Sequence, residues 1–460
     1  MGLFRFALAA LALAWTASVA SAAQGTIGAA WKAEGNQAGA GFGSSVSGAG
    51  DVNGDGYDDV IVGAYAYDGG EPDEGRASVF HGSKEGLAKL PAWTVESNQA
   101  HASINDATAA GDVNGDGYGD VLVASRAFSN GEYLEGAVFL YLGSAAGLAA
   151  SPAWSAEGNE QVAYFGIDIA AAGDVNGDGY GDVIIGAFLA DLAHVQQGEG
   201  AAYVYLGSAG GLSTSPAWSA EGNQRFSGFG DSLSGAGDVN GDGFDDVVVG
   251  ADEMRRGERG EGLVFVYLGS AAGPSTTPDW TVEGGVRGLL FGSSVGSAGD
   301  VNGDGYDDLI VSAPGYMSFL ATGRVSVFLG SAGGLATAPA WTLYGSQSTA
   351  DFALVADAGD LDGDGYDDVL LGSPTFDHGQ RDEGSVFAYF GSPAGLATRT
   401  AWIVESNQRE ALFGSALAGA GDVNGDGFSD VLVGAFQFNN GQVDEGRAFA
   451  FQGASRLRLR

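Results

Sequence analysis

The chain has 460 residues, and its 58 Asp and Glu against 19 Lys and Arg give a formal net charge of −39. Nucleic-acid binding is disfavoured because phosphate contacts need a basic face. Disorder is disfavoured because 45% of residues are hydrophobic and 11% aromatic, enough for a core. The sequence has no cysteine, which excludes disulfides, thiolate catalysis and cysteine-ligated zinc. An acidic surface of this strength suits a cation-binding protein.

The first 22 residues are typical of an export signal. Arg5 supplies a positive charge, Phe6–Trp15 is a short apolar stretch, and Ala20-Ser21-Ala22 fits a cleavage site for small residues. We therefore expect residues 1–22 to be a signal peptide. The mature chain is then secreted or at the cell surface, with the periplasm as a further location. A membrane anchor is the alternative, but the apolar stretch is short for a spanning helix.

A unit of about 62 residues recurs seven times in the rest of the chain. Each unit contains an acidic, glycine-rich string such as "GDVNGDGYDD", and a tryptophan precedes each string. The strings begin at Asp51, Asp112, Asp174, Asp238, Asp300, Asp360 and Asp422. The tryptophans are Trp31, Trp93, Trp154, Trp218, Trp280, Trp341 and Trp402.

Each unit is predicted to contain four strands. In the first unit these are "FGSSVSGAGD" from Phe42, "DVIVGAY" directly after the acidic turn, "RASVFHGS" after a polar loop, and "WTVES" after a "GL…PAW" turn. The second strand is apolar on both faces, as in a buried strand. No segment shows a sustained helical period, and the 81 glycines would weaken helices.

The number of units and the two chain ends predict an all-β fold, a seven-bladed β-propeller with four-stranded blades. Radial packing of blades buries faces that one unit could not bury alone. The first unit begins with a fourth strand at Trp31, and the last ends after a third strand at Gly446–Gly453. The N-terminal strand would therefore complete the last blade and close the ring. One domain is expected over residues 23–455, followed by a short basic tail, 456–460.

The acidic turns have the composition of a calcium site. Counting the first Asp of the turn as position 1, oxygen ligands are available at positions 1, 3, 5 and 9, and the position-7 residue offers its backbone carbonyl. Ca²⁺ takes six to eight hard oxygen ligands, whereas softer metals would want His or Cys. We therefore expect up to seven calcium ions. The candidate ligands are Asp51, Asn53, Asp55, Tyr57, Asp59; Asp112, Asn114, Asp116, Tyr118, Asp120; Asp174, Asn176, Asp178, Tyr180, Asp182; Asp238, Asn240, Asp242, Phe244, Asp246; Asp300, Asn302, Asp304, Tyr306, Asp308; Asp360, Asp362, Asp364, Tyr366, Asp368; and Asp422, Asn424, Asp426, Phe428, Asp430.

The acidic turns allow two other interpretations. An EF-hand would need a Glu at position 12, but this position is apolar in every turn, for example Val62 and Leu371. The second interpretation is a solvated hairpin that binds no ion, because Asn-Gly and Asp-Gly favour tight turns. Seven copies that all keep an Asp at position 9 favour the calcium interpretation.

The combined motif resembles the FG-GAP repeat. A Phe-Gly pair opens five units, at Phe42, Phe165, Phe229, Phe291 and Phe413, and "GAY", "GAF", "SAP" or "GSP" follows the second strand. The second unit has Ser103-Ile104 in this place and the sixth has Asp351-Phe352. The resemblance covers Trp31 to Gly453. It implies the propeller found at the N-terminus of integrin α subunits, with calcium turns on one face and ligands on the opposite face.

The loops between the second and third strands differ from unit to unit, which suits recognition. Ordinary drift in exposed loops is the alternative. Candidate ligand-binding residues in these loops are the aromatic residues Tyr65, Tyr67, Phe128, Phe188, Tyr316, Phe376 and Phe436 and the basic cluster Arg255, Arg256 and Arg259. Phe319 and Phe438 are further aromatic residues in the same loops.

The function expected is a calcium-stabilised binding or adhesion module for an extracellular protein or glycan. An exported hydrolase or lyase-like enzyme and a structural coat component are the alternatives. An enzyme is disfavoured because the histidines His81, His101, His194 and His378 lie in different units without a partner motif. Gly292–Gly296 matches G-x-S-x-G but lacks the strand–turn–helix context that this motif needs.

Overall fold

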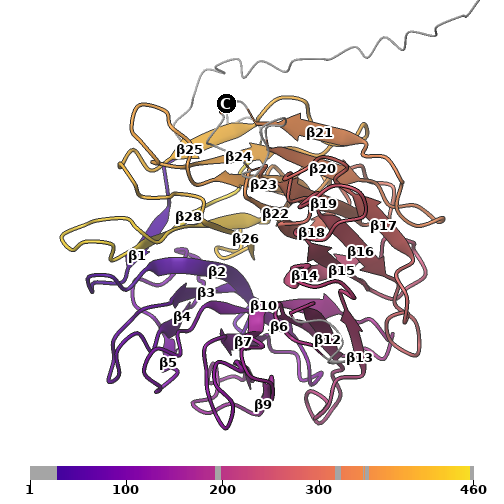
Figure 1. Cartoon of the computed structure of the whole chain (residues 1–460). Coiled ribbons are helices and arrows are strands. Elements are labelled where there is room, and N and C mark those ends of the chain that lie inside the picture. The colour runs from indigo at the N-terminus through magenta and orange to yellow at the C-terminus, as the bar shows by residue number, and fades with distance from the viewer. Residues whose placement is uncertain (1–27, 192–197, 316–322, 346, 348–351, 456–460) are drawn as a thin grey trace, which may run out of the picture.

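The computed structural model describes residues 28–191, 198–315, 323–345, 347 and 352–455. The predicted signal peptide, 1–22, and the basic tail, 456–460, lie outside the described residues. The described residues contain 28 strands and no helix, and the strands form seven four-stranded antiparallel sheets. Figure 1 shows these sheets as blades around a central axis, which confirms the predicted seven-bladed β-propeller.

The two inner strands of each blade flank the acidic turn. The innermost strands, which line the central channel, are β2 (Phe42–Gly50), β6 (Asp106–Gly111), β10 (Phe165–Gly173), β14 (Phe229–Gly237), β18 (Ser294–Gly299), β22 (Leu354–Gly359) and β26 (Ala416–Gly421). The second strands are β3 (Asp59–Ala64), β7 (Asp120–Ser125), β11 (Asp182–Ala187), β15 (Asp246–Ala251), β19 (Asp308–Ala313), β23 (Asp368–Ser373) and β27 (Asp430–Ala435). Every residue of the second strands is buried, as their apolar sequences predict.

The two outer strands complete each blade. The third strands are β4 (Arg76–Phe80), β8 (Ala137–Tyr141), β12 (Ala201–Tyr205), β16 (Leu263–Tyr267), β20 (Arg324–Phe328), β24 (Ser385–Tyr389) and β28 (Arg447–Phe451). The outermost strands are β5 (Trp93–Glu96), β9 (Trp154–Glu157), β13 (Trp218–Glu221), β17 (Trp280–Glu283), β21 (Trp341–Tyr344), β25 (Trp402–Glu405) and β1 (Trp31–Glu34). We number the blades 1 to 7 from the sheet β2–β5 to the sheet β26–β28 with β1.

The N-terminal strand closes the ring, as predicted from the complementary chain ends. Strand β1 pairs antiparallel with β28, with Trp31 opposite Ala450 and Glu34 opposite Arg447. The Glu34 carboxylate forms an ion pair with the Arg447 guanidinium. Blade 7 is therefore built from both ends of the described chain, and each part supplies strands that the other lacks.

Glycine allows adjacent blades to approach closely at one recurring position, the fifth residue of the second strand. A Cβ added at Gly434, in β27, would lie 2.0 Å from the carbonyl oxygen of Gly43 in blade 1. Gly186 and Gly250 are equally close to the next blade: a Cβ added at either residue would lie 2.1 Å from a glycine carbonyl oxygen. Since real Cβ atoms do not come this close, a side chain at these positions would push the blades apart.

The two units that lack Phe-Gly fill the same space with other side chains. Ile104 and Phe352 are both buried, and the Phe352 ring meets Phe387 edge-on at 5.5 Å. Backbone hydrogen bonds between the first and second strands define the register. In blade 7 the N–H of Gly414, the glycine of Phe-Gly, donates to the Gly434 carbonyl oxygen. The equivalent bonds run from Asn105 to Ala124 in blade 2 and from Ala353 to Gly372 in blade 6. The replacements for Phe-Gly are therefore Ile104-Asn105 and Phe352-Ala353, one residue later than the sequence alignment of units suggested.

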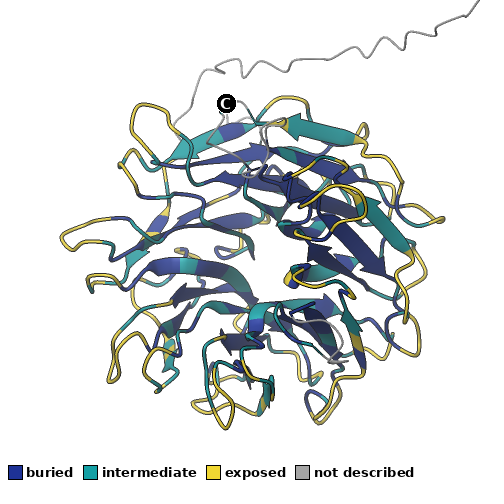
Figure 2. Ribbon diagram, in the orientation of Figure 1, coloured by how far each residue is buried: buried dark blue, intermediate teal, exposed yellow. Residues whose placement is uncertain are grey.

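The antiparallel order of the strands gives the ring two distinct faces. The acidic turns and the links from third to fourth strands lie on one face, which we call the turn face. The links from second to third strands and from each blade to the next lie on the opposite face, the loop face. Figure 2 shows buried strands surrounded by exposed loops. Among the described residues, no helix has the length and apolarity to cross a membrane.

Candidate metal centres on the turn face

Each acidic turn folds around the carboxylate at position 1. In the first turn, Asp51 accepts backbone N–H bonds from Gly54 and Gly56, both at 2.7 Å, and from Asp55 at 3.1 Å. The two glycines have φ of +73° and +89°, which disfavours other residues there. Position 1 accepts two or three such bonds in every turn, at Asp51, Asp112, Asp174, Asp238, Asp300, Asp360 and Asp422.

The position-9 carboxylate is buried at the start of each second strand. Asp59 is fully buried, and its two oxygens accept bonds from the N–H groups of Val52, at 3.1 Å, and Gly82, at 2.8 Å. Burial raises the pKa of Asp59 to about 7, although the two backbone N–H groups lower it. The same burial raises the pKa of Asp120 to about 6 and that of Asp368 to about 8. Each oxygen keeps a further lone pair, so hydrogen bonding does not prevent it from binding a cation.

The side chain at position 3 adopts two arrangements. In turns 2 to 4 it points toward position 5: for example, the Asn114 amide donates to Asp116 at 3.0 Å. In turn 6, oxygens of Asp360, Asp362 and Asp368 all lie within 4.8 Å of one another. Ligands of one Ca²⁺, each at about 2.3–2.6 Å, must lie within about 5 Å of one another. The donor set of turn 6 therefore fits a hard divalent cation.

Turn 5 gives independent support for this fit. The side-chain oxygen of Asn302, at position 3, is buried and has no hydrogen-bond partner among the described residues. Buried acceptors are normally satisfied, so such an atom calls for an ion or water. The donors in all seven turns are oxygens, and the position-5 carboxylates are exposed beside them. This composition suits Ca²⁺ rather than a metal that prefers nitrogen or sulfur.

The turns of neighbouring blades also contact one another, a feature that the sequence did not predict. The aromatic ring at position 7 lies over the position-4 glycine of the preceding turn, so that a Cβ at Gly54 would be 2.6 Å from the Tyr118 ring. The position-8 N–H donates to the position-1 carbonyl oxygen of the preceding turn, as from Gly119 to Asp51 at 3.0 Å. Tyr57 and Asp58 continue the series to turn 7 across the ring closure. The seven turns therefore form one continuous ring.

An aspartate at position 8 adds a second hydrogen bond between neighbouring turns. The Asp58 carboxylate accepts the backbone N–H of Asp422 at 2.8 Å, and Asp245 accepts that of Asp174 at 2.7 Å. Asp307 and Asp367 bond the preceding turns in the same way. The sequence shows that Asp recurs at position 8, but its spacing alone does not reveal that the carboxylate accepts a hydrogen bond from the neighbouring blade.

A second feature missed from the sequence is a glutamate at the base of the variable loops. One Glu74 oxygen accepts N–H bonds from Gly69 at 2.7 Å, Gly70 at 2.5 Å and Glu71 at 3.1 Å. Burial would raise the pKa of Glu74, but these bonds outweigh it and lower the pKa. Equivalent bonds are made by Glu135, Glu261, Glu383 and Glu445. A Glu-Gly pair precedes the third strand in six units, and this recurrence could have indicated the glutamate's role at the loop base.

The structure divides the candidate ligand-binding aromatic residues into two groups. Tyr65 is exposed and meets Phe436 at 6.2 Å, although the two residues come from blades 1 and 7. Phe188 lies against Tyr164 at 5.6 Å on blade 3. By contrast, other candidates pack inward beneath the loops: Tyr67 under Arg76, Phe128 against Phe139, and Phe376 against Phe387.

The remaining candidates lie apart from these pairs. Arg255, Arg256 and Arg259 are exposed on blade 4. Tyr316 and Phe319 lie outside the described residues. The structure therefore brings Tyr65 and Phe436 together but distributes the other candidates over separate blades.

The histidines and the G-x-S-x-G string do not form a catalytic group among the described residues. His101 pairs with Asp73 at 3.0 Å and His378 with Glu405 at 2.8 Å, both on exposed parts of different blades. His194 lies outside the described residues. Ser294 is buried in β18, and its hydroxyl oxygen accepts the backbone N–H of Val355 in blade 6 at 3.3 Å. The serine therefore serves the contact between blades.

The central channel contains partly buried carboxyl groups. It encloses about 590 Å³ and is lined by the innermost strands, including Asp106, Asp168 and Asp357. Loss of solvent raises the pKa of Asp106 and of Asp357 to about 7, and it raises the pKa of Asp168 well above its usual range, with the Asp106 charge adding to the effect. These carboxyl groups are therefore easier to protonate in the folded chain than in the unfolded chain.

This burial predicts that stability falls as the pH rises. A raised folded-state pKa gives a stabilising contribution that is complete below about pH 4 and is lost as the pH rises through about 7. Replacing Asp357→Asn should therefore stabilise the protein by about 1–2 kcal/mol at pH 8 and have little effect at pH 4. Urea unfolding at both pH values measures this. Equal effects at both would show that the Asp357 carboxyl titrates normally.

The fold and the turns together define the class of protein: a seven-bladed β-propeller with an acidic turn in every blade. A model of the FG-GAP repeat matches seven segments that together cover more than half of the chain, residues 42–80, 105–141, 165–205, 229–267, 291–328, 352–389 and 413–450. The chain therefore belongs to the FG-GAP repeat family, as the resemblance indicated.

Relatives at the sequence level are integrin α subunits. The chain is 30% identical to integrin alpha-5 of Xenopus laevis over 247 residues, which is 50% of this chain and 22% of the relative. It is 39% identical to human integrin alpha-IIb over 158 residues, 32% of this chain and 15% of the relative. The matched part is thus less than a quarter of each relative. A chain in the crystal structure of BBS1N in complex with ARL6DN has the same fold, with a TM-score of 0.51 and 9% identity over 92% of this chain and 96% of that chain.

Proposed function

We propose that the protein is an exported, calcium-binding propeller whose loop face binds a protein or glycan ligand. The observation that carries this proposal is the contrast between the two faces. The turn face repeats one oxygen-rich turn seven times and joins the copies into a ring, whereas the loops opposite differ in every blade. A uniform frame with variable loops is typical of recognition proteins. The similarity to integrin α subunits supports an adhesive role.

Calcium has a structural role in this proposal. Seven ions would offset about 14 negative charges of an acidic chain. A cation beside Asp59 or Asp368 would also favour the ionised carboxylate and reverse the effect of burial on the pKa. Because neighbouring turns are hydrogen-bonded, each ion would also hold the ends of two blades. The protein would then be exported after cleavage of residues 1–22, with residues 23–455 as one domain.

Loss of one position-9 carboxylate should remove one calcium site. Asp368→Asn in turn 6 keeps the shape of the side chain but removes a charged ligand, so calorimetric titration should show one ion fewer per chain than the unmodified protein. The matched control is Glu85→Gln, which removes one exposed charge on the same face. Equal stoichiometry for the two variants would contradict the assignment of Asp368 as a ligand.

Ligand binding is tested by screening the purified full chain against glycan and matrix-protein arrays, with calcium and with EGTA. The proposal expects binding that requires calcium and is lost when loop-face residues such as Tyr65 are replaced. Failure to bind any probe in either condition would favour a structural coat component. Hydrolysis of a polysaccharide or lipid probe would instead favour the enzyme alternative.

A further inference from the structure

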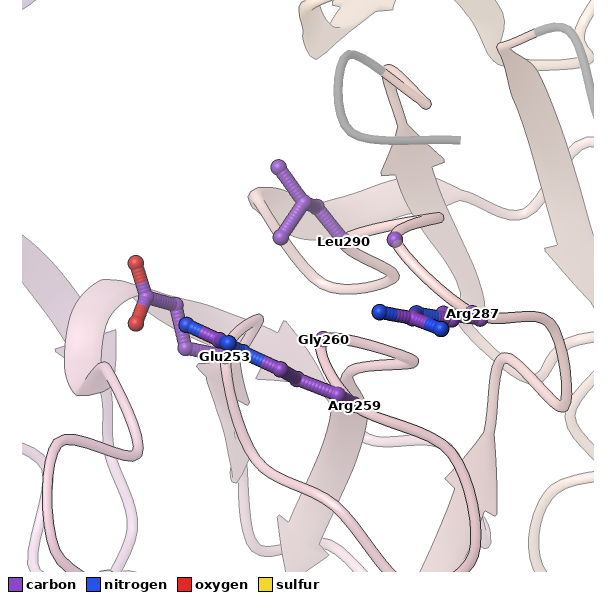
Figure 3. A pocket seen from close by; sticks show the side chains of 6 residues that line it. Glu253, Arg259, Gly260, Arg287 and Leu290 are labelled. Carbon is purple, nitrogen blue, oxygen red and sulfur yellow. The ribbon is translucent and has the colours of Figure 1, made fainter. Parts of the chain in front are cut away.

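A pocket on the loop face lies at the junction of blades 4 and 5. It has a volume of about 280 Å³ and is lined by Glu253, Arg259, Gly260, Arg287, Gly288 and Leu290; we call it the arginine pocket. Its first three residues lie in the loop between β15 and β16, and the others lie between β17 and β18. Figure 3 shows Arg259 extending toward Glu253, while Arg287 enters from the other side and Leu290 lies above.

The two arginines are held on a rigid frame. The Arg259 carbonyl oxygen accepts the Gly288 N–H at 3.0 Å, and the Gly260 carbonyl oxygen accepts the Leu290 N–H at 3.0 Å. The loop-base glutamate of this blade, Glu261, accepts the N–H groups of Arg256 and Gly257. Both backbone segments are therefore fixed before any ligand binds, which reduces the entropy lost on binding.

Neither guanidinium has a charged partner among the residues that the structure describes. Arg259 and Arg287 are both exposed, and neither belongs to an ion pair within the described part of the chain. In a chain with a net charge of −39, two unpaired arginines in one pocket are unexpected. A guanidinium offers five N–H donors in a planar fork that matches a carboxylate.

Blade 6 contains the same pair of arginines with a carboxylate between them. There the Arg381 carbonyl oxygen accepts the Glu410 N–H at 2.8 Å, as Arg259 accepts Gly288, and Arg409 precedes Glu410 as Arg287 precedes Gly288. The Glu410 carboxylate lies 3.0 Å from the Arg409 guanidinium and 3.7 Å from that of Arg381. The chain itself therefore shows which group this pair of arginines binds.

Two positions differ between the blades: blade 6 has Glu410 where blade 4 has Gly288, and it has Asp382, which pairs with Arg381 at 2.9 Å, where blade 4 has Gly260. Glu410 has φ of +58° and Gly288 has φ of +69°, so the backbones follow the same path. In blade 4 the glycine leaves the arginines without the internal carboxylate. A carboxylate from another molecule can take the place that Glu410 fills in blade 6.

We propose that the arginine pocket binds an Asp or Glu side chain on a protein partner, a proposal that rests on the loop face being the ligand-binding face. A protein carboxylate is favoured over a sugar acid because none of the six lining residues is aromatic, so the pocket offers no flat face on which a sugar ring could stack. A polyanion is disfavoured because Glu253 lines the pocket and the chain as a whole carries a net charge of −39. The pocket thus suits one isolated carboxylate.

The test uses the full chain with ¹⁵N-labelled arginine and a capped pentapeptide that carries one glutamate between glycines. The peptide should shift the Nε–H resonances of Arg259 and Arg287, whereas the same peptide with glutamine should not. Arg287→Gln should weaken binding about tenfold, the value expected for one charge-assisted contact. Arg399→Gln, an exposed arginine in the link from β24 to β25, is the matched control and should bind normally.

Two reciprocal variants use the difference between blades 4 and 6. Gly288→Glu should fill the pocket from within and abolish peptide binding, and its melting temperature should stay close to that of the unmodified chain because blade 6 accepts a glutamate at the same φ. Replacing both Asp382→Gly and Glu410→Gly should create a second site at Arg381 and Arg409, because it removes both carboxylates that pair with Arg381. Unchanged binding by Gly288→Glu would overturn the proposal.

The remaining outcomes separate this inference from the general function. Tighter binding of a methyl glucuronide than of the glutamate peptide would overturn the assignment to a protein partner. A ligand from the array screen that binds Gly288→Glu unchanged would refute the arginine pocket as its site and leave the loop face as a binding surface. Calcium-dependent binding that falls in Gly288→Glu would support both.

Discussion

Removal of calcium is expected to lower the melting temperature by about 10 °C. A site with a dissociation constant of about 0.1 mM in about 1 mM calcium stabilises the folded chain by about 1.4 kcal/mol. Seven independent sites would contribute about 10 kcal/mol, similar to the whole stability of a typical domain. For a chain of this length, with about 2 cal/mol/K of unfolding entropy per residue, that free energy corresponds to a shift of about 10 °C.

Calorimetric melts in calcium and in EGTA measure this shift. The control is EGTA saturated with calcium, which tests for effects of the chelator itself. Magnesium should restore little of the loss, because it demands stricter geometry and keeps its own water ligands. A melting temperature that is the same in EGTA and calcium would contradict a structural role for the ions.

Replacing Trp31→Ala is expected to destabilise the protein by about 3–5 kcal/mol, the range for a buried tryptophan. Trp31 is 7% exposed, its ring meets Phe80 edge-on at 4.9 Å, and its indole N–H donates to the Ala88 carbonyl oxygen at 2.8 Å. Phe80 and Ala88 belong to blade 1, whereas Trp31 completes blade 7. The side chain therefore joins the strand that closes the ring to the first blade.

The matched control is Trp93→Ala in blade 1. Trp93 makes the same contacts to the next blade, with an indole N–H bond to Ala149 at 2.9 Å, but its strand follows β4 directly in the chain. Trp31→Ala should cost more stability than Trp93→Ala and should expose the N-terminal strand to proteolysis. Equal losses and equal protease resistance would show that ring closure does not depend on Trp31.

The number of blades, the four strands per blade and the closure by β1 were predictable from the sequence. They follow from features that recur at fixed spacing: the tryptophan, the all-apolar second strand and the acidic turn. The replacements at Ile104 and Phe352 were placed one residue too early, because the hydrogen-bond register that defines their position is not visible in one dimension.

The details of the turn face were less predictable, because they depend on contacts between blades. Six turns have Asn at position 3. The Asn114 amide donates to Asp116 at position 5, whereas the side-chain oxygen of Asn302 is buried without a hydrogen-bond partner among the described residues. Tyr118 was predicted to offer a backbone carbonyl, and its ring also covers Gly54 of the preceding turn. Only the packing of two neighbouring turns reveals this second role.

The loop face shows the same limit. Tyr65 and Tyr67 are two residues apart, but Tyr65 is exposed and Tyr67 is covered by Arg76 at 3.6 Å. Arg287 was not among the sequence candidates, because it lies in the link between blades rather than in the variable loop. Its partner Arg259 is 28 positions earlier in the chain, and only the fold brings the two into one pocket.

A crystal structure grown in calcium would test the central claim most directly. Anomalous scattering should show one calcium ion in each of the seven turns, bound by oxygens from positions 1, 3, 5 and 9 and by the carbonyl oxygen of position 7. Turns without an ion at millimolar calcium, with the position-9 carboxylates still bonded only to backbone N–H groups, would contradict the account.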